Sequence, residues 1–455
     1  MKKNLLIIAI FLSFSSLTFA GGIVTNTNQT AHFLRNPSRG ASMEIDAAYE
    51  NPAGLVFLTD GLHLSISNQS AFQTRTITST FAPFAMNGGS TTKEYKGVTN
   101  SPIIPSIQIA YKKDRFVLSG HFSVVGGGGK VTFDDGLPSF ESMVAVLPLA
   151  LTHNGLTTTA YDMNCSMEGN SYIFGFQLNG SYKITDALSA GVGIRVNMAN
   201  NGYKGSLTDI RINPLHPVLN PTAAMMSAPT FFTNAGMTTY AAATADKQID
   251  CKQTGWGIAP IISVDYHLNK LNLAAKYEFR TSIDVENDTK VDGTGMFPDG
   301  AKTANDIPAF LTVAAAYELS DKWNISGGYH HFFDSDARMA NDKQENINGG
   351  IDEALFGTEY QINDRFLVSA GMQYTNTNVT DAYQSDLSYS LDSYSVGMGA
   401  AINLSPKVRL NLAYFFTKYN KWTKESASYN GTGLTGKDIY DRTNNDVGVG
   451  LDFIF

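Results

Sequence analysis

The end of the chain alternates strictly between two kinds of side chain. Apolar residues occupy every second position of the final stretch: Val447, Val449, Leu451, Phe453 and Phe455. Small or acidic residues and one isoleucine lie between them: Asp446, Gly448, Gly450, Asp452 and Ile454. In water, a terminal strand of this kind would be an aggregation-prone edge. The pattern therefore favours a closed barrel in a membrane, where the last strand pairs with the first and its apolar face contacts lipid.

Residues 1–20 have the features of a secretory signal peptide. Lys2 and Lys3 precede an apolar stretch, and Ala20 stands before two glycines at a typical cleavage position. No cysteine follows directly, so no lipid anchor is expected. No later segment reaches the roughly 18 apolar residues of a membrane-spanning helix. We therefore expect an exported mature chain that crosses no membrane as a helix.

The composition also favours a transmembrane β-barrel. Aromatic residues make up 11% of the chain, there are 41 glycines, and only 16% of residues are charged, against about 25% in ordinary soluble domains. A Gly-rich, aromatic-rich and charge-poor exported chain is typical of such barrels. The net charge of −8 argues against nucleic acid as a partner.

Six segments share one pattern, in which a few turn-forming polar residues separate two apolar stretches: 110–118, 181–190, 265–274, 317–326, 360–369 and 402–411. Each predicts two antiparallel strands joined by a tight turn. The six turns join twelve strands, and a first strand near 62–70 and the terminal strand make fourteen. An even number is what a bacterial barrel requires. The predicted fold class is all-β, a 14-stranded antiparallel transmembrane β-barrel over residues 61–455.

Long segments separate these turns: 74–102, 126–169, 201–254, 284–306, 335–349, 379–388 and 421–443. Short turns at one end and long loops at the other are typical of the periplasmic and extracellular ends of an outer-membrane barrel. We therefore expect the protein in the outer membrane of a Gram-negative bacterium.

Residues 21–60 lack the strand pattern and precede a first strand that begins at the periplasmic end. We expect them to fold into the lumen as a plug, with an ordered periplasmic extension as the alternative. Within this segment, Pro52 fixes its own φ and favours an extended Asn51. Ala53 and Gly54 keep the resulting turn slim.

The stretch "NPAG" at 51–54, preceded by "RGAS" at 39–42 and "DAA" at 46–48, resembles the N-terminal signature of the FadL family. Members of that family are outer-membrane transporters of long-chain fatty acids and other hydrophobic compounds. The resemblance implies a fourteen-stranded barrel with an N-terminal hatch and passive uptake of hydrophobic molecules. It also implies a kinked third strand that opens the wall sideways.

Four glycines lie at the end of the predicted third strand: Gly126, Gly127, Gly128 and Gly129. Glycines permit a bulge or kink, in keeping with the wall opening that the resemblance implies. A loose hinge between strand and loop is the alternative. The glycines do not form a phosphate loop, because Val131 stands where Ser or Thr is needed.

Two of the expected loops are apolar. Loop 126–169 and loop 201–254 contain these large apolar residues: Phe140, Met143, Leu147, Met225, Met226, Phe231 and Phe232. Exposed apolar patches are costly, and flexible Met and Phe surfaces suit loosely selective apolar ligands. The resemblance implies that these residues contact the substrate in an outer groove. Mutual packing of the loops over the barrel mouth is a compatible alternative.

Strand parity directs several charged side chains into the lumen. Arg195, Lys276 and Arg280 are expected at mid-height on neighbouring strands. There they are candidates to bind the carboxylate of a fatty acid. The alternative is that these lumenal charges pair with one another or with the plug.

The two cysteines, Cys165 and Cys251, fall in expected loops on the same side of the membrane. An exported protein can keep a disulfide, and two free thiols are the equal alternative. Two cysteines do not suffice for a metal site, and no metal or cofactor is expected.

Two other functions remain as alternatives. A diffusion porin for polar solutes would need neither a plug nor apolar loops. An outer-membrane hydrolase is disfavoured because the chain has no Gly-x-Ser-x-Gly, and His121, His330 and Ser326 have lumen-facing parity. No catalytic residue is therefore predicted. The expected partners are outer-membrane lipid, a hydrophobic substrate such as a fatty acid, and the barrel-assembly machinery, which would bind the strand ending in Phe455; a monomer is expected.

Overall fold

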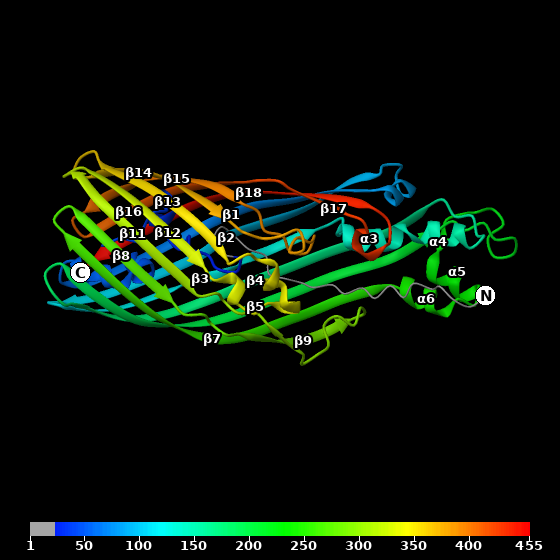
Figure 1. Cartoon of the computed structure of the whole chain (residues 1–455), viewed down its shortest axis with the longest axis horizontal. Coiled ribbons are helices and arrows are strands. Elements are labelled where there is room, and N and C mark those ends of the chain that lie inside the picture. The colour runs from blue at the N-terminus through cyan, green and yellow to red at the C-terminus, as the bar shows by residue number, and fades with distance from the viewer. Residues whose placement is uncertain (1–22) are drawn as a thin grey trace.

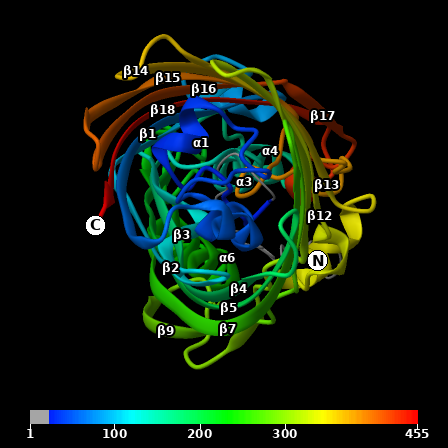
Figure 2. The same cartoon turned by 90° about the vertical axis from the view of Figure 1, so that its left-hand side faces the viewer.

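The computed structural model describes residues 23–455, and the signal peptide predicted over 1–20 lies outside them. Within the described range, fourteen antiparallel strand positions form a closed barrel, because β1 pairs with β18 from one end to the other (Figure 2). The predicted fold class is confirmed. No helix in residues 23–455 combines the length and the apolar character needed to cross a membrane.

The strands have these bounds: β1 (Gly61–Phe81), β2 (Thr92–Lys113), β3 (Phe116–Phe133), β4 (Tyr161–Lys183), β5 (Leu188–Ile212), β6 (Met226–Ser227), β7 (Lys247–Leu268), β8 (Leu271–Glu278), β9 (Asp284–Asp292), β10 (Lys302–Ala304), β11 (Phe310–Ser320), β12 (Trp323–Phe332), β13 (Ile351–Gln361), β14 (Phe366–Asn376), β15 (Ser393–Ser405), β16 (Val408–Tyr419), β17 (Trp422–Ser426) and β18 (Gly436–Ile454). β8 and β9 are the two halves of one barrel strand, and β10 and β11 are the halves of the next. β17 extends the pairing of β16 with β18, and β6 is a short strand in a loop.

Short helices lie in the plug and in the extracellular loops. Those of the plug are α1 (Ala31–Arg35), α2 (Ala47–Glu50) and the 3-10 helix η1 (Pro52–Phe57). Those of the loops are η2 (Ala82–Met86), α3 (Pro138–Ala145), α4 (Leu147–His153), α5 (Ala228–Asn234), α6 (Thr238–Thr244), η3 (Asp334–Asp336), η4 (Ala340–Asn346) and η5 (Tyr429–Gly431).

All six predicted short turns are present at one end of the barrel. They join β2 to β3, β4 to β5, β7 to β8, β11 to β12, β13 to β14 and β15 to β16. Outward side chains such as Leu178, Val192 and Val449 are 63%, 65% and 46% exposed, whereas the lumenal Gln177 and Asp446 are buried. An apolar exterior around a polar interior is the arrangement of a transmembrane barrel.

On one side of the barrel, the predicted loops are longer than the loops of the structure. β1 to β5, β7 and β18 contain between 18 and 25 residues and extend well beyond β11 to β16 (Figure 1). The predicted loops 74–102, 126–169 and 201–254 therefore include strand residues at both ends. In the upper part of β4, Asp162 and Asn164 are exposed on the outer face. The outer face thus becomes polar beyond the lipid, and the apolar alternation that indicates a strand is lost there.

Both cysteines lie in strands rather than in loops, Cys165 in β4 and Cys251 in β7. β5 runs between them, with Leu207 opposite Cys165 and Tyr203 opposite Cys251. Both thiols are free, so the disulfide alternative is wrong for this structure. Across residues 23–455, His, Cys, Asp and Glu form no group of three or more that is placed to hold a metal ion.

Residues 23–60, here called the plug, lie inside the barrel (Figure 2). Helix α1 packs against β15, β16 and β18, and its Leu34 is fully buried. This close approach to the wall requires glycine at two wall positions. A Cβ on Gly448 would lie only 2.7 Å from Leu34 Cδ1, and a Cβ on Gly397 would lie only 2.4 Å from the Leu34 carbonyl oxygen. The predicted lumenal plug is confirmed, and the alternative of a periplasmic extension is wrong.

Candidate functional site

The "NPAG" turn is fixed to the inner wall of the barrel by its first residue. The Asn51 Nδ2 donates to Asp265 Oδ2 at 3.0 Å and to the Val264 carbonyl at 3.2 Å, both in β7. Asn272 of β8 donates to the same Asp265 oxygen at 3.1 Å. One buried carboxylate thus joins the plug to two strands.

The rest of the turn also makes hydrogen bonds to the wall. Ser181 of β4 donates to the Pro52 carbonyl at 2.7 Å, and the Ala53 N–H donates to Ser263 Oγ of β7 at 3.1 Å. The expected slim turn is present, since a Cβ on Gly54 would lie 2.4 Å from a backbone oxygen of the plug. The motif therefore has a concrete structural role, which is to anchor the plug.

Two of the three predicted lumenal cations meet at mid-height in one ion cluster. Arg195 Nη1 lies 2.6 Å from Glu278 Oε2, and Lys276 Nζ lies 2.7 Å from Glu278 Oε1. Lys276 also donates to the Tyr49 carbonyl of the plug at 2.8 Å, and both cations lie within 5 Å of the Tyr49 ring centre. The geometry matches the alternative in which lumenal charges pair with one another and with the plug.

Arg280 lies apart from this cluster. The strand breaks between β8 and β9, so Arg280 leaves the ladder and becomes 45% exposed in its side chain. It donates to the Asp336 carbonyl at 2.5 Å and lies 3.8 Å from Asp306. Its predicted inward position beside Lys276 is wrong, because strand parity holds only within a continuous strand.

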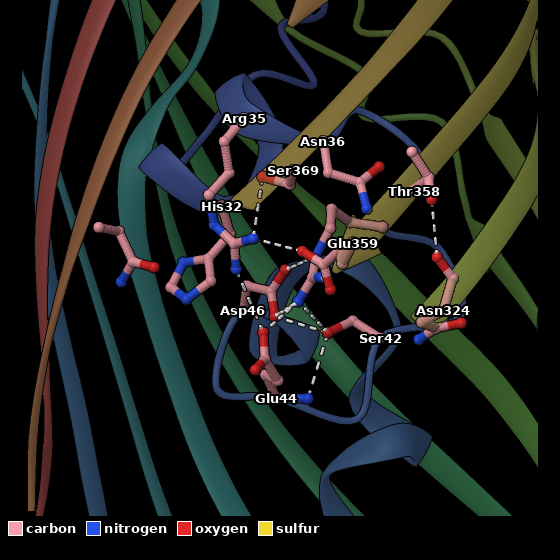
Figure 3. Close-up of polar contacts among 12 residues, drawn as sticks. His32, Arg35, Asn36, Ser42, Glu44, Asp46, Asn324, Thr358, Glu359 and Ser369 are labelled. Atoms are coloured by element: carbon pink, nitrogen blue, oxygen red, sulfur yellow. Dashed lines mark hydrogen bonds and ion pairs between the residues drawn. The ribbon is translucent and has the colours of Figure 1, made fainter. Parts of the chain in front are cut away.

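A second ion cluster ties the plug to the periplasmic half of the wall (Figure 3). Within the plug, Arg39 forms an ion pair with Asp46 at 2.6 Å. Arg35 contacts Glu359 of β13, and Arg39 Nη1 lies 3.4 Å from the other oxygen of the same carboxylate. Arg35 also donates to Ser369 of β14 at 3.1 Å. A network of this kind holds the plug to several strands at once.

The same cluster reaches the last strands of the barrel. Arg409 of β16 pairs with Glu44 at 2.6 Å, and His32 lies 3.0 Å from Asp452 of β18. This cluster was not predicted, although the charged residues of the plug stretch 39–46 were a usable signal in the sequence. Their partners lie more than 300 residues away, and no local pattern identifies them.

Glu50 is buried in the plug, and its Oε1 has no hydrogen-bond partner within residues 23–455. Burial raises the pKa of the Glu50 carboxyl to about 8, although the charge of Lys276 opposes the rise. Between its ordinary pKa near 4.5 and about 8, the native protein holds this proton more tightly than the unfolded chain does. The contribution of Glu50 to stability therefore falls as pH rises through that window.

We expect Glu50→Gln to flatten the pH dependence of unfolding and to be more stable than the wild type at pH 9. Glutamine mimics the protonated acid and never acquires a charge. Urea unfolding midpoints at pH 5, 7 and 9 check this, with Glu425→Gln at an exposed position as the control. Parallel pH profiles for the wild type and the Glu50 variant would contradict the assignment.

The extracellular end holds a large apolar cluster, here called the cap. Leu147, Phe231 and Phe232 are buried in it, while Phe140 and Met226 pack against it. Met143 and Met225 are partly exposed. The two apolar loops therefore pack against each other, which is the mutual-packing alternative given above. The cap also includes lumenal side chains of β1, β2, β4 and β18: Ile77, Phe81, Tyr95, Tyr161 and Tyr440. The loops and these strand residues thus form one buried apolar cluster.

The wall is interrupted between β2 and β3. Their ladder runs from Lys113–Phe116 to Ile107–Phe122 and resumes only at Val98–Thr132. On the β3 side, bulges at the predicted glycines Gly126, Gly127, Gly128 and Gly129 shift its register against β4. The kink is therefore present at the predicted place.

On the β2 side of this gap stand two prolines. Pro102 and Pro105 have no N–H to donate to a ladder. From inside, the plug covers the gap: the Asn26 N–H donates to the Val125 carbonyl at 2.8 Å, and the Gly127 N–H donates to the Val24 carbonyl at 3.0 Å. Thus the backbone of the plug, rather than a neighbouring strand, completes the wall here.

A plugged, lipid-facing barrel with an apolar cap and an interrupted wall defines an outer-membrane channel protein. Residues 170–451, more than half of the chain, match the family model of the outer membrane protein transport proteins (OMPP1/FadL/TodX). The chain belongs to this family, as the resemblance at 51–54 indicated. This membership and the barrel place it in the outer membrane of a Gram-negative bacterium.

The fold is shared with solved structures at low sequence identity. A Pseudomonas aeruginosa FadL homologue has a TM-score of 0.65 at 12% identity, over 96% of this chain and 100% of that one. The Pseudomonas putida toluene transporter TodX has a TM-score of 0.58 at 15% identity, over 96% and 100%. The Ralstonia pickettii toluene transporter TbuX has 0.53 at 14%, over 90% and 94%. No curated protein sequence matches this chain.

Proposed function

We propose that this protein lets hydrophobic molecules enter the cell by passive diffusion, with long-chain fatty acids as the first candidate cargo. Cargo would first contact the cap through the loop residues named above, of which Phe140, Met143, Met225 and Met226 are partly exposed. Aromatic hydrocarbons are the second candidate, because two structurally similar proteins are toluene transporters. The lumenal cations Arg195 and Lys276 are engaged with Glu278 and the plug, which disfavours them as ligands of a carboxylate.

The interrupted β2–β3 ladder is the observation that carries the proposal. Cargo that has passed the cap would leave sideways through this gap into the outer leaflet of the bilayer. The plug segment 24–29 covers the gap from inside and would have to move aside. Prolines on one side and glycines on the other prevent the strands from closing it.

Single-channel recording separates this function from that of a polar-solute porin. We expect no large, steady ion current across planar bilayers, because the plug fills the lumen. We also expect the protein to restore uptake of tritiated oleate in cells that lack their own fatty-acid transporter. Porin-like conductance without any oleate uptake would contradict the proposal.

We further propose that the protein is not an enzyme. Ser123 Oγ lies 2.7 Å from His121 Nε2, which resembles a nucleophile and its base. The Nδ1 of His121, however, has no hydrogen-bond partner within residues 23–455, whereas hydrolytic triads orient that nitrogen with an acid. Lipid hydrolysis that disappears in Ser123→Ala would contradict this.

We also propose the domain boundaries and the binding partners that the sequence predicts. Residues 1–20 would be removed on export, leaving a plug that ends near residue 60 and a barrel over 61–455. The assembly machinery would bind the terminal strand through Phe455, whose side chain is 63% exposed on the outer face. The protein would then act as a monomer in contact with lipid.

A further inference from the structure

Two polar side chains interrupt the lipid-facing row of β1. Asn68 and Ser70 point outward, since the residues that alternate with them are buried on the lumenal side. The nearest outward residues along β1, and those directly opposite in β18, are all apolar and exposed: Ile66, Phe72, Val447 and Val449. A polar group at this depth is costly unless it has a hydrogen-bond partner. The two side chains therefore need a structural reason to be there.

The neighbouring strand β2 carries a bulge at the same height. Between residues 69 and 71 of β1, the facing segment 101–104 of β2 contains one residue more than β1. In the part of the chain that the structure describes, Pro102 and Ile103 of this bulge pair with neither β1 nor β3. The bulge lies beside the gap in the β2–β3 ladder, so no strand faces it on that side. Its backbone groups must find hydrogen-bond partners elsewhere.

Asn68 and Ser70, here called the clip, supply these partners. The Asn68 Nδ2 donates to the Pro102 carbonyl at 3.2 Å, and the Ile104 N–H donates to Asn68 Oδ1 at 3.1 Å. The Ser70 hydroxyl donates to the same Pro102 carbonyl at 2.7 Å. Side chains of β1, rather than the backbone of β3, thus satisfy the backbone of β2 at the edge of the gap.

We propose that Asn68 and Ser70 are positioning residues for the sideways release of cargo. A bulge bends its strand locally, and the clip fixes β2 in this bent conformation, apart from β3. Without the clip, the backbone of residues 102–104 would turn toward the free edge of β3 for hydrogen bonds, and the gap would narrow. Neither side chain needs to touch the cargo, because each acts through the backbone of β2. The inference rests on the proposed transport of hydrophobic molecules and adds a second device, on β2, to the glycine bulges of β3.

The test compares uptake with binding in the variant Asn68→Leu, which removes both amide contacts at a similar side-chain size. Uptake of tritiated oleate is measured in cells that lack their own fatty-acid transporter, and binding is measured with the purified protein in lipid nanodiscs. We expect uptake to fall while binding stays at the wild-type level, whereas a purely stabilising residue would lower both. Exchange of the Ile104 amide, followed by NMR, should become about tenfold faster, as expected for one lost hydrogen bond.

The matched control is Asn200→Leu, the same change on the outer face of β5, where residue 200 is paired with both neighbouring strands. It should leave uptake and binding unchanged. The heat-modifiable mobility of the barrel on gels reports whether each variant has folded. Should Asn68→Leu fail to fold, Ser70→Ala, which removes a single donor, serves the same comparison.

The outcomes separate this inference from the transport proposal. Wild-type uptake by a folded variant that lacks the clip contacts would overturn the inference and leave the transport proposal intact. A parallel loss of uptake and binding would also overturn it, because the clip would then act on the fold alone. Failure of the wild type to take up oleate would overturn the transport proposal itself.

Discussion

Replacing Glu278 with glutamine is expected to destabilise the folded protein by about 3–5 kcal/mol, because removing one partner of a buried ion cluster leaves uncompensated charge. Arg195 and Lys276 are 3% and 2% exposed, and both pair with this one carboxylate. Two neighbouring cations would then remain in the middle of the lumen without the charge that they share. Urea unfolding of the protein in lipid vesicles, followed by the fluorescence of its three tryptophans, measures the loss.

The matched control is an exposed pair of the same chemistry. Glu286 lies 3.4 Å from Lys302, and their side chains are 54% and 65% exposed. Glu286→Gln should change stability by less than about 1 kcal/mol, as is usual for surface ion pairs. Equal effects of the two substitutions would show that the lumenal cluster does not hold the plug and barrel together.

Deleting Gly127 and Gly128 is expected to reduce uptake of hydrophobic cargo at least tenfold. Val124 and Gly129 of β3 are five residues apart in the sequence. Their partners in β4, Phe174 and Ser171, are only three residues apart. The deletion removes this excess of two residues and draws β3 back into line with the wall. Because the number removed is even, every later side chain keeps its lumenal or lipid-facing side. The barrel should therefore fold while the lateral gap narrows.

Oleate uptake by cells and oleate binding by the purified protein are measured side by side for this deletion. We expect binding to persist while uptake falls, because the cap and the lumen are retained. Deleting Gly88 and Gly89 from the exposed loop between β1 and β2 is the control, since both lie in open space. Unchanged uptake after loss of Gly127 and Gly128 would show that cargo leaves by another route.

The barrel itself could be predicted because its signals are local. Each short turn combines polar residues with flanking apolar strands, and the alternation ending at Phe455 identifies both faces of a strand. The extent of the strands could not be predicted, because their outer faces become polar beyond the lipid, as at Asp162 and Asn164 in β4. There the sheet is fixed by pairing with its neighbours rather than by its own pattern.

The candidate site, like the barrel, could be predicted only in part from the sequence. Parity correctly directed Arg195 and Lys276 into the lumen, but not Arg280, because the break after β8 cannot be inferred from alternation. The glycines of β3 indicated a kink, whereas the opposite side of the gap, at Pro102 and Pro105 of β2, was not predicted. Prolines normally argue against a central strand, and here they mark the place where the ladder is absent.

Photo-crosslinking tests the central claim, sideways release through the wall, most directly. A palmitate analogue with a terminal diazirine is allowed to enter the protein in membranes, irradiated, and mapped on the chain by mass spectrometry. We expect labels at the residues that line the β2–β3 gap, namely Ser101, Ile104 and Val124. Labels confined to the cap and to the cavity of about 750 Å³ at the periplasmic rim, lined by Phe57, Val408 and Phe453, would instead show release into the periplasm and contradict it.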